Sequence, residues 1–492
     1  MTDTTHHYLT VDLGAESGRV ILGTLQNGRL ALDEIHRFTN GPVRQDDGLH
    51  WDVQHLWREI KNGMRIASAQ AGPHLSSIGL DTWGVDFGLL DERDQLLADP
   101  FHYRDSCTNG MMEKAFAVVS RDEIYRRTGI QFMQFNTLYQ LIAMAGSPQM
   151  AAARSLLFMP DLFNFWLSGV KANEYTVAST SQCLNPFIRS WDLDLLDRFG
   201  IPGRIFGRIL PPGSILGNLL PAVAAETGCP LVPVVAVGSH DTASAVAGVP
   251  ASAEDFIYLS SGTWSLMGME TPGPVVTPAS LAHNITNEGG VNGTIRLLKN
   301  IMGMWLLQEC RAEWARAGQK SSYDQLTALA ADAPAFGSVV HPNDNVFLEP
   351  GAMVWRIAQF CQQTGQSVPT GQGQIARCIL ESLALEYRRI ATQLQQLTGR
   401  TASTIHIVGG GSRNGLLNQF TADCTGKMVV AGPVEATAAG NILVQAIALG
   451  HVTGLQEGRE IIRKSFTPQV FQPGDPSGWL EAYQRFTYEE VL

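Results

Sequence analysis

One pattern occurs twice in this chain: an apolar strand runs into a short turn of small residues, and a second apolar strand starts at once. The first copy reads YLTVDLGAESGRVILG at residues 8–23, and the second reads FIYLSSGTWSLMG at residues 256–268. Two short apolar runs separated by a glycine-containing turn are typical of a β-hairpin. We therefore expect each half of the chain to open with an antiparallel hairpin.

The segments that follow each hairpin predict similar topology in the two halves. In the first half the expected elements are a strand at 30–38 after the Asn27-Gly28 turn, a helix at 53–70 and a strand at 77–82. In the second half they are a strand at 404–408, a helix at 415–425, a strand at 428–431 and a helix of small residues at 436–449. The sequence thus predicts an α/β fold of two ribonuclease-H-like domains, residues 1–247 and 248–492, with a cleft between them.

The length and charge of the chain limit its partners. At 492 residues and 53.5 kDa it is too long for one core, and its net charge of −11 disfavours nucleic acid. The polar N-terminus lacks the order of a signal peptide, and no apolar stretch is long enough to span a bilayer. Seven cysteines without a CxxC pair indicate neither a zinc knuckle nor a secreted disulfide framework. We expect a cytoplasmic protein, a monomer or weak homo-oligomer, that binds small molecules and neither nucleic acid nor membrane.

The two turns carry different chemistry. In the first, Asp12 at the end of a strand can hold Mg²⁺ through water. Gly14 and Gly18 let the backbone approach an anion, and Arg19 adds a guanidinium. The second turn, LSSGT, is neutral, so it binds an anion only through backbone N–H groups and hydroxyls. Taken alone, each of these segments is more typical of an ordinary hairpin turn or bulge. Taken together, the two turns predict that a triphosphate is bound from both sides.

Two further segments suggest ligand contacts. The glycine-rich VGGGSRNG at 408–415 lies between a predicted strand and helix and can seat an adenosine against bare backbone, although Asn414 breaks the dinucleotide fingerprint G-x-G-x-x-G. In GSHDTASAV, Asp241 either caps a helix or acts as a general base toward an attacking hydroxyl. His240 and Thr242 are then its hydrogen-bonding neighbours.

An aromatic and acidic segment suggests a sugar. DTWGVD at 81–86, followed by Tyr103-Arg104-Asp105, offers an apolar platform with paired donors and acceptors, as a polyhydroxylated ligand requires. A strand edge with ordinary turn carboxylates explains the same residues equally well.

Taken in order, these motifs resemble a known family. DLGAESGR, DTWGVDF, YRDS, SHDTASAV, LSSGTWSLMG, NITNEGG, LKNIMG, VGGGSRN and AGPVEAT span nearly the whole chain. They resemble the FGGY carbohydrate kinases of the actin/hexokinase/Hsp70 superfold and, within that family, the bacterial rhamnulokinases. Trp264 after SSGT favours the deoxyketose kinases over those acting on glycerol or xylulose.

The resemblance implies a role for each matching position. The implied ATP contacts are Ala15, Glu16, Ser17, Gly18, Arg19, Thr263, Gln308 and Gly410. The implied sugar contacts are Gly84, His240, Asp241, Thr242 and Asn300. Asp12 is implied as the Mg²⁺-associated residue and Asp241 as the catalytic base. Glu16 stands where relatives carry Ser or Thr, so we expect its backbone N–H, and not its carboxylate, to face the phosphates.

The implied reaction is transfer of the γ-phosphoryl group of ATP to the 1-hydroxyl of L-rhamnulose, with ATP and Mg²⁺ as the cofactors. A kinase for another ketose such as L-fuculose is the near alternative. An actin-like ATPase or sugar sensor, and an oxidoreductase using VGGG, are alternatives of other classes. A disulfide between Cys361 and Cys378, as seen in a relative, is compatible with this chain but a cytoplasmic protein does not require it.

Overall fold

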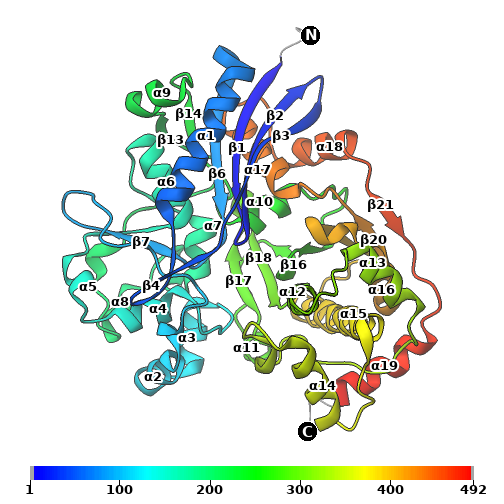
Figure 1. The fold of residues 1–492 in the computed structure, drawn as a ribbon. Helices are drawn as coiled ribbons and strands as arrows, with labels where there is room; N and C mark the ends of the chain where they lie inside the picture. The colour runs from blue at the N-terminus through cyan, green and yellow to red at the C-terminus, as the bar shows by residue number, and fades with distance from the viewer. Residues whose placement is uncertain (1–4, 489–492) are drawn as a thin grey trace. The chain divides into compact units, whose positions relative to one another are not determined.

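The computed structural model describes residues 5–488 of the chain (Figure 1). Its contacts group into two compact units: residues 1–250, 270–297 and 436–466 form unit 1, and residues 251–269, 298–435 and 467–492 form unit 2. Two segments of the second half of the sequence are thus grouped with the first half. The sequence-based domain boundary between residues 247 and 248 stays a prediction.

Unit 1 is built on a six-stranded sheet in the order β13-β14-β6-β1-β2-β3. These strands are β1 (His6–Leu13), β2 (Ser17–Gln26), β3 (Arg29–Thr39), β6 (Leu75–Thr82), β13 (Ser214–Asn218) and β14 (Pro233–Ala236). β1, β2 and β3 pair antiparallel, whereas β6 runs parallel to β1 and β14 parallel to β6. The predicted first hairpin and the return strand are confirmed.

Helices cover this sheet because their apolar residues recur on one face. In α1 (Val53–Ala71) the buried residues include Val53, Leu56, Ile60 and Met64, as the helical period predicts. Asp52 caps the helix by accepting a hydrogen bond from the His55 N–H at 2.7 Å. α17 (Ala436–Ala448) packs on β1, β6 and α10 (Asp241–Ala247).

The other elements grouped with unit 1 surround this core. The helices are α2 (Met111–Val118), α3 (Arg121–Thr128), α4 (Thr137–Met144), α5 (Pro148–Ala152), α6 (Met159–Ser168), α7 (Tyr175–Ala178), α8 (Leu193–Arg198), α9 (Pro221–Thr227), α11 (Pro278–Ala282) and α18 (Leu455–Ser465). The short strands are β4 (Pro42–Gln45), β5 (Gly48–Trp51), β7 (Phe87–Leu90), β8 (Ser155–Phe158), β9 (Asn173–Glu174), β10 (Leu184–Asn185), β11 (Ser190–Trp191) and β12 (Ile209–Leu210).

The second sheet has the order β17-β18-β16-β15-β19-β20-β21. Its strands are β15 (Ile257–Ser261), β16 (Ser265–Thr271), β17 (Thr286–Gly289), β18 (Ile295–Ile301), β19 (Thr404–Val408), β20 (Met428–Ala431) and β21 (Gln469–Phe471). β15 pairs antiparallel with β16 and parallel with β19, which repeats the β2-β1-β6 arrangement. The helices of unit 2 are α12 (Trp305–Arg316), α13 (Tyr323–Asp332), α14 (Met353–Gln363), α15 (Gly371–Thr398), α16 (Gly415–Thr425) and α19 (Ser477–Tyr488).

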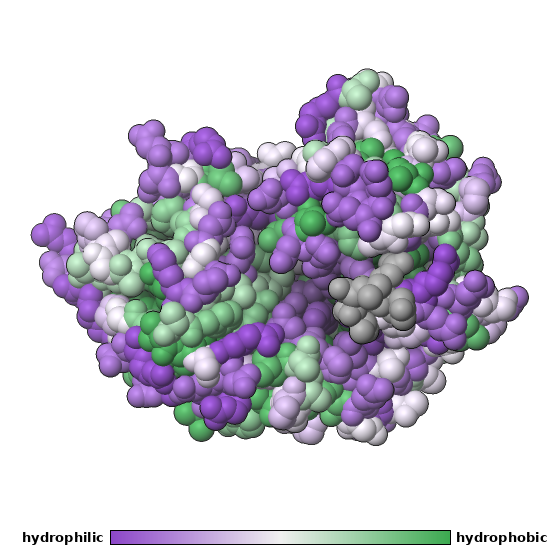
Figure 2. All heavy atoms as spheres, turned by 90° about the horizontal axis from the view of Figure 1, so that it is seen from below, coloured by the Kyte–Doolittle hydropathy of each residue, from purple (hydrophilic) through white to green (hydrophobic). Residues whose placement is uncertain are grey.

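Polar and apolar residues are mixed on the surface of the molecule. One face, drawn in Figure 2, carries mainly hydrophilic residues with hydrophobic ones between them. Within residues 5–488 no helix combines the length and the apolar character that crossing a membrane requires.

Candidate active site

The first turn joins β1 to β2 and is held by its own backbone. The Gly14 N–H donates to the Ser17 carbonyl at 3.0 Å, and the Asn40 side chain donates to the Gly14 carbonyl at 2.8 Å. Gly18 is required by packing, because a Cβ there would lie 2.3 Å from the Phe38 ring. Glu16 is exposed, which agrees with a backbone role for this position.

Two carboxylates lie side by side at the end of this hairpin. Asp12 on β1 is the register partner of Asp81 on β6, and Asp12 also forms an ion pair with Arg19. Asp81 is fully buried and accepts a hydrogen bond from Asn441 Nδ2 at 2.5 Å, while its Oδ1 has no partner among the described residues. Burial, and then the neighbouring charges of Asp12 and Asp241, raise the pKa of Asp81 well above its ordinary value.

These oxygens fit a magnesium ion. Mg²⁺ is usually held by one or two carboxylates together with waters and substrate phosphates. Asp12 and the unpartnered Oδ1 of Asp81 supply that donor set. The described part of the chain has no group of three or more His, Cys, Asp or Glu residues that would form an all-protein metal cage.

The DTWGVD segment forms a strained turn directly after β6. Val85 has a φ of 67°, which is a rare conformation for a β-branched residue, and the Asp86 N–H donates to the Gly84 carbonyl at 2.9 Å. Thr180 Oγ1 accepts from the Val85 N–H at 3.1 Å, and Thr137 Oγ1 donates to the Val85 carbonyl at 2.6 Å. The backbone of Val85, next to Gly84, is therefore fixed through both its N–H and its carbonyl, and strain of this kind is concentrated at functional sites.

Asp86 anchors this turn from within the core. Its carboxylate accepts hydrogen bonds from Trp51 Nε1 at 2.7 Å, Trp83 Nε1 at 3.0 Å and Gln140 Nε2 at 2.9 Å. The side chain is fully buried, and this burial raises its pKa to about 7. Asp105 is likewise buried and accepts from the Leu49 and Cys107 N–H groups. Both carboxylates are buried and hydrogen-bonded within the fold, and a sugar contact of this segment stays a prediction.

Asp241 is the first residue of α10, and His240 is its N-cap. The N-cap position is thus one residue earlier than predicted, although the Asp241 side chain still accepts from an N–H of the first helical turn. Its Oδ1 accepts from the Thr242 N–H at 2.5 Å and from Thr242 Oγ1 at 3.1 Å, and its side chain remains 32% exposed. Partial burial, followed by the charge of Asp12, raises the pKa of Asp241 although His240 acts against it. The Thr82 N–H donates to the Ser239 carbonyl at 2.9 Å, which joins the DTWGVD and SHDT segments.

In unit 2 the second turn contacts two other predicted ATP segments. Gln308 Nε2 donates to Thr263 Oγ1 at 3.2 Å, and a Cβ on Gly411 would lie 2.0 Å from Ser261 Oγ. Gly410 opens a short 3₁₀ turn after β19, and a Cβ on it would meet nothing within 4 Å. Asn300, which the pattern alone would place in a loop, lies in β18. The structure thus brings Thr263, Gln308 and the glycine triplet together.

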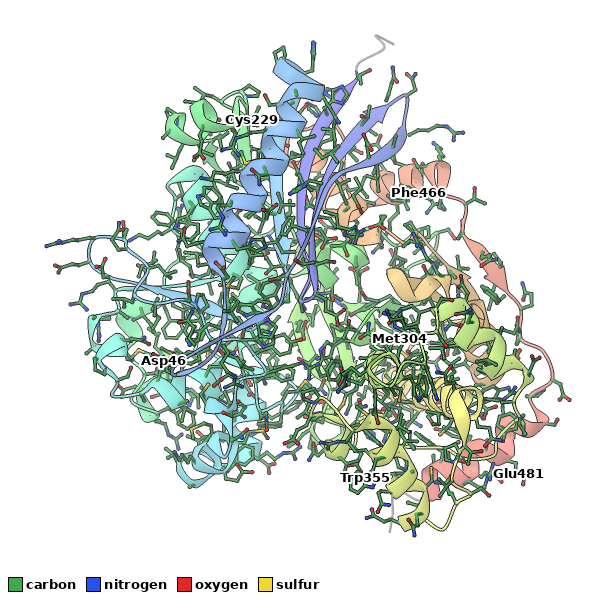
Figure 3. The ribbon with its side chains drawn as sticks, in the orientation of Figure 1. Asp46, Cys229, Met304, Trp355, Phe466 and Glu481 are labelled. Carbon is green, nitrogen blue, oxygen red and sulfur yellow. The ribbon has the colours of Figure 1, made fainter. Side chains whose placement is uncertain are left out.

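The cysteines are free thiols in the structure. Cys229, labelled in Figure 3, is buried and its thiol contacts the Met64 carbonyl at 3.3 Å. Cys361 and Cys378 lie next to each other on α14 and α15, and a hydrogen bond between their side chains raises the pKa of Cys378 well above its ordinary value. The two residues are adjacent, as the resemblance implies, but no disulfide joins them in this structure.

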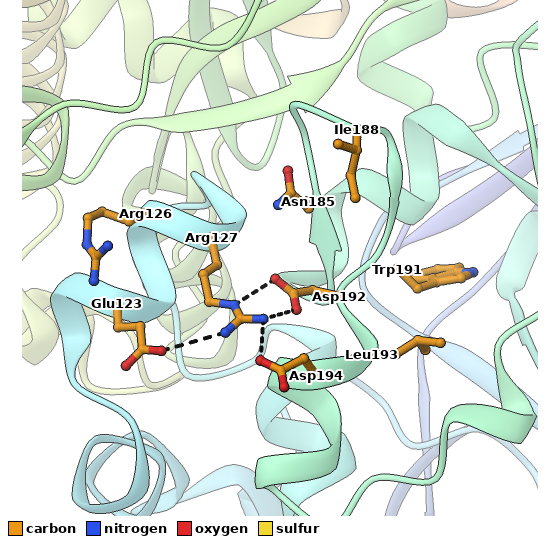
Figure 4. Close-up of a pocket in the computed structure, with 9 residues that line it drawn as sticks. All are labelled: Glu123, Arg126, Arg127, Asn185, Ile188, Trp191, Asp192, Leu193 and Asp194. Carbon is orange, nitrogen blue, oxygen red and sulfur yellow. Dashed lines mark hydrogen bonds and ion pairs between the residues drawn. The ribbon is translucent and has the colours of Figure 1, made fainter.

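A cavity of about 480 Å³ lies elsewhere in unit 1 (Figure 4). Its centre is Arg127, which lies 2.7 Å from Asp194 and 3.6 Å from Glu123 and donates to Asp192 at 2.8 Å. None of the predicted site residues lines it, so it is separate from the candidate active site.

Sequence reasoning missed several buried polar residues behind the site, chiefly Glu174, Arg296 and Asn441. Each has an ordinary local pattern: Arg296 lies in an apolar strand and Asn441 in a helix of small residues. Each also has a partner far away in the sequence that no local pattern reveals: Ser239 for Glu174, His240 for Arg296 and Asp81 for Asn441. The NEGG motif that contains Glu288 was the one available pointer.

Known protein families and proteins match this chain over most of its length. The N-terminal domain model of the FGGY family of carbohydrate kinases matches residues 7–248, and the C-terminal domain model matches residues 257–449. A rhamnulokinase of Bacteroides thetaiotaomicron is 46% identical over 98% of both chains, and one of Oceanobacillus iheyensis is 43% identical over 93% of this chain and 96% of the other.

Solved structures extend the likeness to the fold. Gluconate kinase from Lactobacillus acidophilus is 16% identical with a TM-score of 0.82, covering 99% of this chain and 98% of the other. Plasmodium falciparum glycerol kinase with ADP is 15% identical with a TM-score of 0.79 over the same shares. The predicted two-domain α/β fold is thereby confirmed. The chain belongs to the FGGY family of carbohydrate kinases.

Proposed function

We propose that this chain transfers the γ-phosphoryl group of ATP to the 1-hydroxyl of L-rhamnulose, yielding L-rhamnulose 1-phosphate and ADP. The observation that carries the substrate is the 42–46% identity to proteins named rhamnulokinase along almost the entire chain. The observation that carries the chemistry is Asp241, a partly exposed carboxylate with a raised pKa at the start of a helix.

Asp241 acts as the general base. Its raised pKa makes the carboxylate a better proton acceptor, and its remaining exposure leaves it accessible to a substrate hydroxyl. It takes the proton of the 1-hydroxyl as that oxygen attacks the γ-phosphorus and ADP leaves. The backbone at Gly84, which precedes the strained Val85, and the side chains of His240, Thr242 and Asn300 orient the sugar.

The two turns stabilise the charge that spreads over the transferred phosphoryl group. We assign this role to the backbone N–H groups of residues 15–18, to the Arg19 guanidinium and to Thr263, with Gln308 and Gly410 contacting the nucleotide. Asp12, with Asp81 beside it, would hold Mg²⁺, which neutralises phosphate charge when bound.

A coupled ADP-release assay against a panel of ketoses tests the proposal. L-rhamnulose should give the largest kcat/KM, with L-fuculose and D-xylulose as the discriminating competitors. Asp241→Asn should abolish phosphoryl transfer and leave ATP affinity nearly unchanged. A higher kcat/KM for another ketose would show that L-rhamnulose is not the preferred substrate. Phosphoryl transfer by Asp241→Asn at nearly the wild-type rate would show that Asp241 is not the general base.

A further inference from the structure

A buried arginine lies behind the proposed catalytic base. Arg296 on β18 has no exposed surface, and its Nε donates to the Gly289 carbonyl at 2.8 Å. Its Nη2 lies 3.1 Å from Glu288 Oε2 and 3.0 Å from His240 Nδ1. A guanidinium is costly to bury, and the buried carboxylate of Glu288 offsets its charge.

The contact with Arg296 determines which nitrogen of the His240 ring carries the proton. Arginine carries only donors, so at 3.0 Å from Nη2 the His240 Nδ1 atom must accept and cannot itself hold a proton. The proton of the neutral ring therefore sits on Nε2. Glu288 Oε2 is also near Nδ1, at 3.3 Å, and would favour a proton there if Arg296 were absent.

The Nε2–H side of the ring faces the catalytic carboxylate. His240 Nε2 lies 3.5 Å from Asp241 Oδ1, the same oxygen that accepts both hydrogen bonds from Thr242. In the part of the chain that the structure describes, the hydrogen bonds and the ion pair of the Asp241 carboxylate all go to Oδ1. Its Oδ2 is the oxygen left to receive a proton.

The backbone at this point is held independently of Arg296. Glu174 Oε2 accepts from the Ser239 N–H at 3.1 Å, and Thr176 Oγ1 accepts from the His240 N–H at 3.1 Å. Removal of the Arg296 donor should therefore change the ring tautomer without displacing the chain.

We infer that Arg296, backed by Glu288, is a positioning residue that holds His240 as the Nε2–H tautomer and so directs Asp241 Oδ1 inward and Oδ2 to the substrate hydroxyl. The inference rests on the proposed function for the role of Asp241. The tautomer itself does not depend on that function.

The first experiment reads the tautomer directly. The full-length protein, labelled with ¹⁵N-histidine, is studied by two-bond ¹H–¹⁵N correlation NMR, and His240→Gln identifies the His240 signals. We expect the wild type to show the Nε2–H form. In Arg296→Met the proton should move to Nδ1, where Glu288 accepts it. A wild-type ring protonated on Nδ1, or an unchanged tautomer in folded Arg296→Met, overturns the inference.

The second experiment reads the consequence for catalysis. Arg296→Met should lower kcat about 10- to 100-fold with the KM for ATP unchanged, because a misdirected base affects proton transfer and not nucleotide binding. Arg296→Lys keeps a donor and a charge and should retain the Nε2–H form and most of kcat. Arg296→Met removes the charge that offsets the buried Glu288 carboxylate and can fail to fold. Arg296→Lys therefore gives a second test: if it shows the Nδ1–H form, or the kinetic loss expected of Arg296→Met, the inference is also overturned.

A matched control distinguishes the positioning of His240 from the general effect of removing an arginine that forms ion pairs. Arg127→Met removes an arginine that contacts three carboxylates but not His240 (Figure 4). It should leave the tautomer and kcat unchanged, and a loss equal to that of Arg296→Met would count against the inference. A wild type that phosphorylates no ketose yet shows the Nε2–H form refutes the proposed function and supports the tautomer assignment.

Discussion

The helix that carries Asp241 is positioned by a close contact that can be perturbed with one methyl group. α10 and α17 meet at Gly440, where an added Cβ would lie 1.8 Å from the Ser244 carbonyl oxygen and 2.8 Å from the Gly248 N–H. An ordinary contact needs at least 3.4 Å, so the new Cβ of Gly440→Ala would lie about 1.6 Å too close to the Ser244 carbonyl oxygen. Because this oxygen belongs to the backbone, it cannot rotate away as a side chain could. The two helices must separate by roughly that amount.

Two measurable losses should follow from this separation. Overpacking of a well-filled interface costs about 1–3 kcal/mol of unfolding free energy. Asp241 is the first residue of α10, and a displacement of about 1 Å of a catalytic group costs roughly 100-fold in rate. Urea denaturation and the ADP-release assay measure the two effects.

Gly415→Ala is the control for helix propensity. It adds the same methyl group to α16, where the nearest atom would be 3.9 Å from the new Cβ. It should stabilise the protein by up to about 1 kcal/mol, and only this stability is compared, because Gly415 belongs to the segment predicted to seat the adenosine. If Gly440→Ala were as stable and as active as wild type, the close contact would not set the position of Asp241.

Three further outcomes are expected. Burial raises the pKa of Glu174 from 4.5 to about 7, so the folded protein binds this proton more tightly than the unfolded chain does. The unfolding free energy of the wild type should therefore fall by roughly 3 kcal/mol, relative to that of Glu174→Gln, as the pH rises from 4.5 to 7. Urea titrations at several pH values measure this difference. Thr263→Val removes the acceptor of Gln308 and should raise the KM for ATP about fivefold with the ketose KM unchanged, measured by initial rates. Thiol titration of the unreduced, denatured protein should count all seven cysteines, including Cys361 and Cys378.

Elements with strong local signals could be predicted closely from the sequence. The strand at 404–408 and the helix at 415–425 agree with β19 and α16 residue for residue, because a glycine run separates them and Gly426 ends the helix in the left-handed conformation. The two hairpins were likewise predictable, since turn chemistry is encoded within a few residues.

The features that local patterns did not predict depend on packing between distant segments. Asp241 looks like a helix cap in the sequence, yet the structure starts the helix one residue earlier, with His240 as the cap. Asn300 follows Lys299 and stands three residues before Gly303, so it looks like a loop residue before a helix, but it lies inside β18. The grouping of residues 436–466 with unit 1 has no sequence signal at all.

The reason for that grouping is a buried polar network on α17. Asn441 Nδ2 donates to Asp81 Oδ2 at 2.5 Å, and Gln445 Nε2 donates to Asn441 Oδ1 at 2.7 Å. Ser77 Oγ donates to Gln445 Oε1 at 2.7 Å, so strand β6 and the helix satisfy each other's polar groups. Only glycine fits between them at position 79, where a Cβ would lie 2.5 Å from Asn441 Oδ1. An unpaired polar group here would cost about 1–3 kcal/mol, which makes this docking specific.

One helix from the second half of the sequence therefore sets two parts of the proposed site. Gly440 determines how closely α10, and with it Asp241, can approach, while the adjacent Asn441 fixes Asp81 beside Asp12. A change in the position of α17 would move the base and the carboxylate pair together. Gly440 and Asn441, which have no assigned role in binding ATP or sugar, therefore restrict the position of both parts of the proposed site.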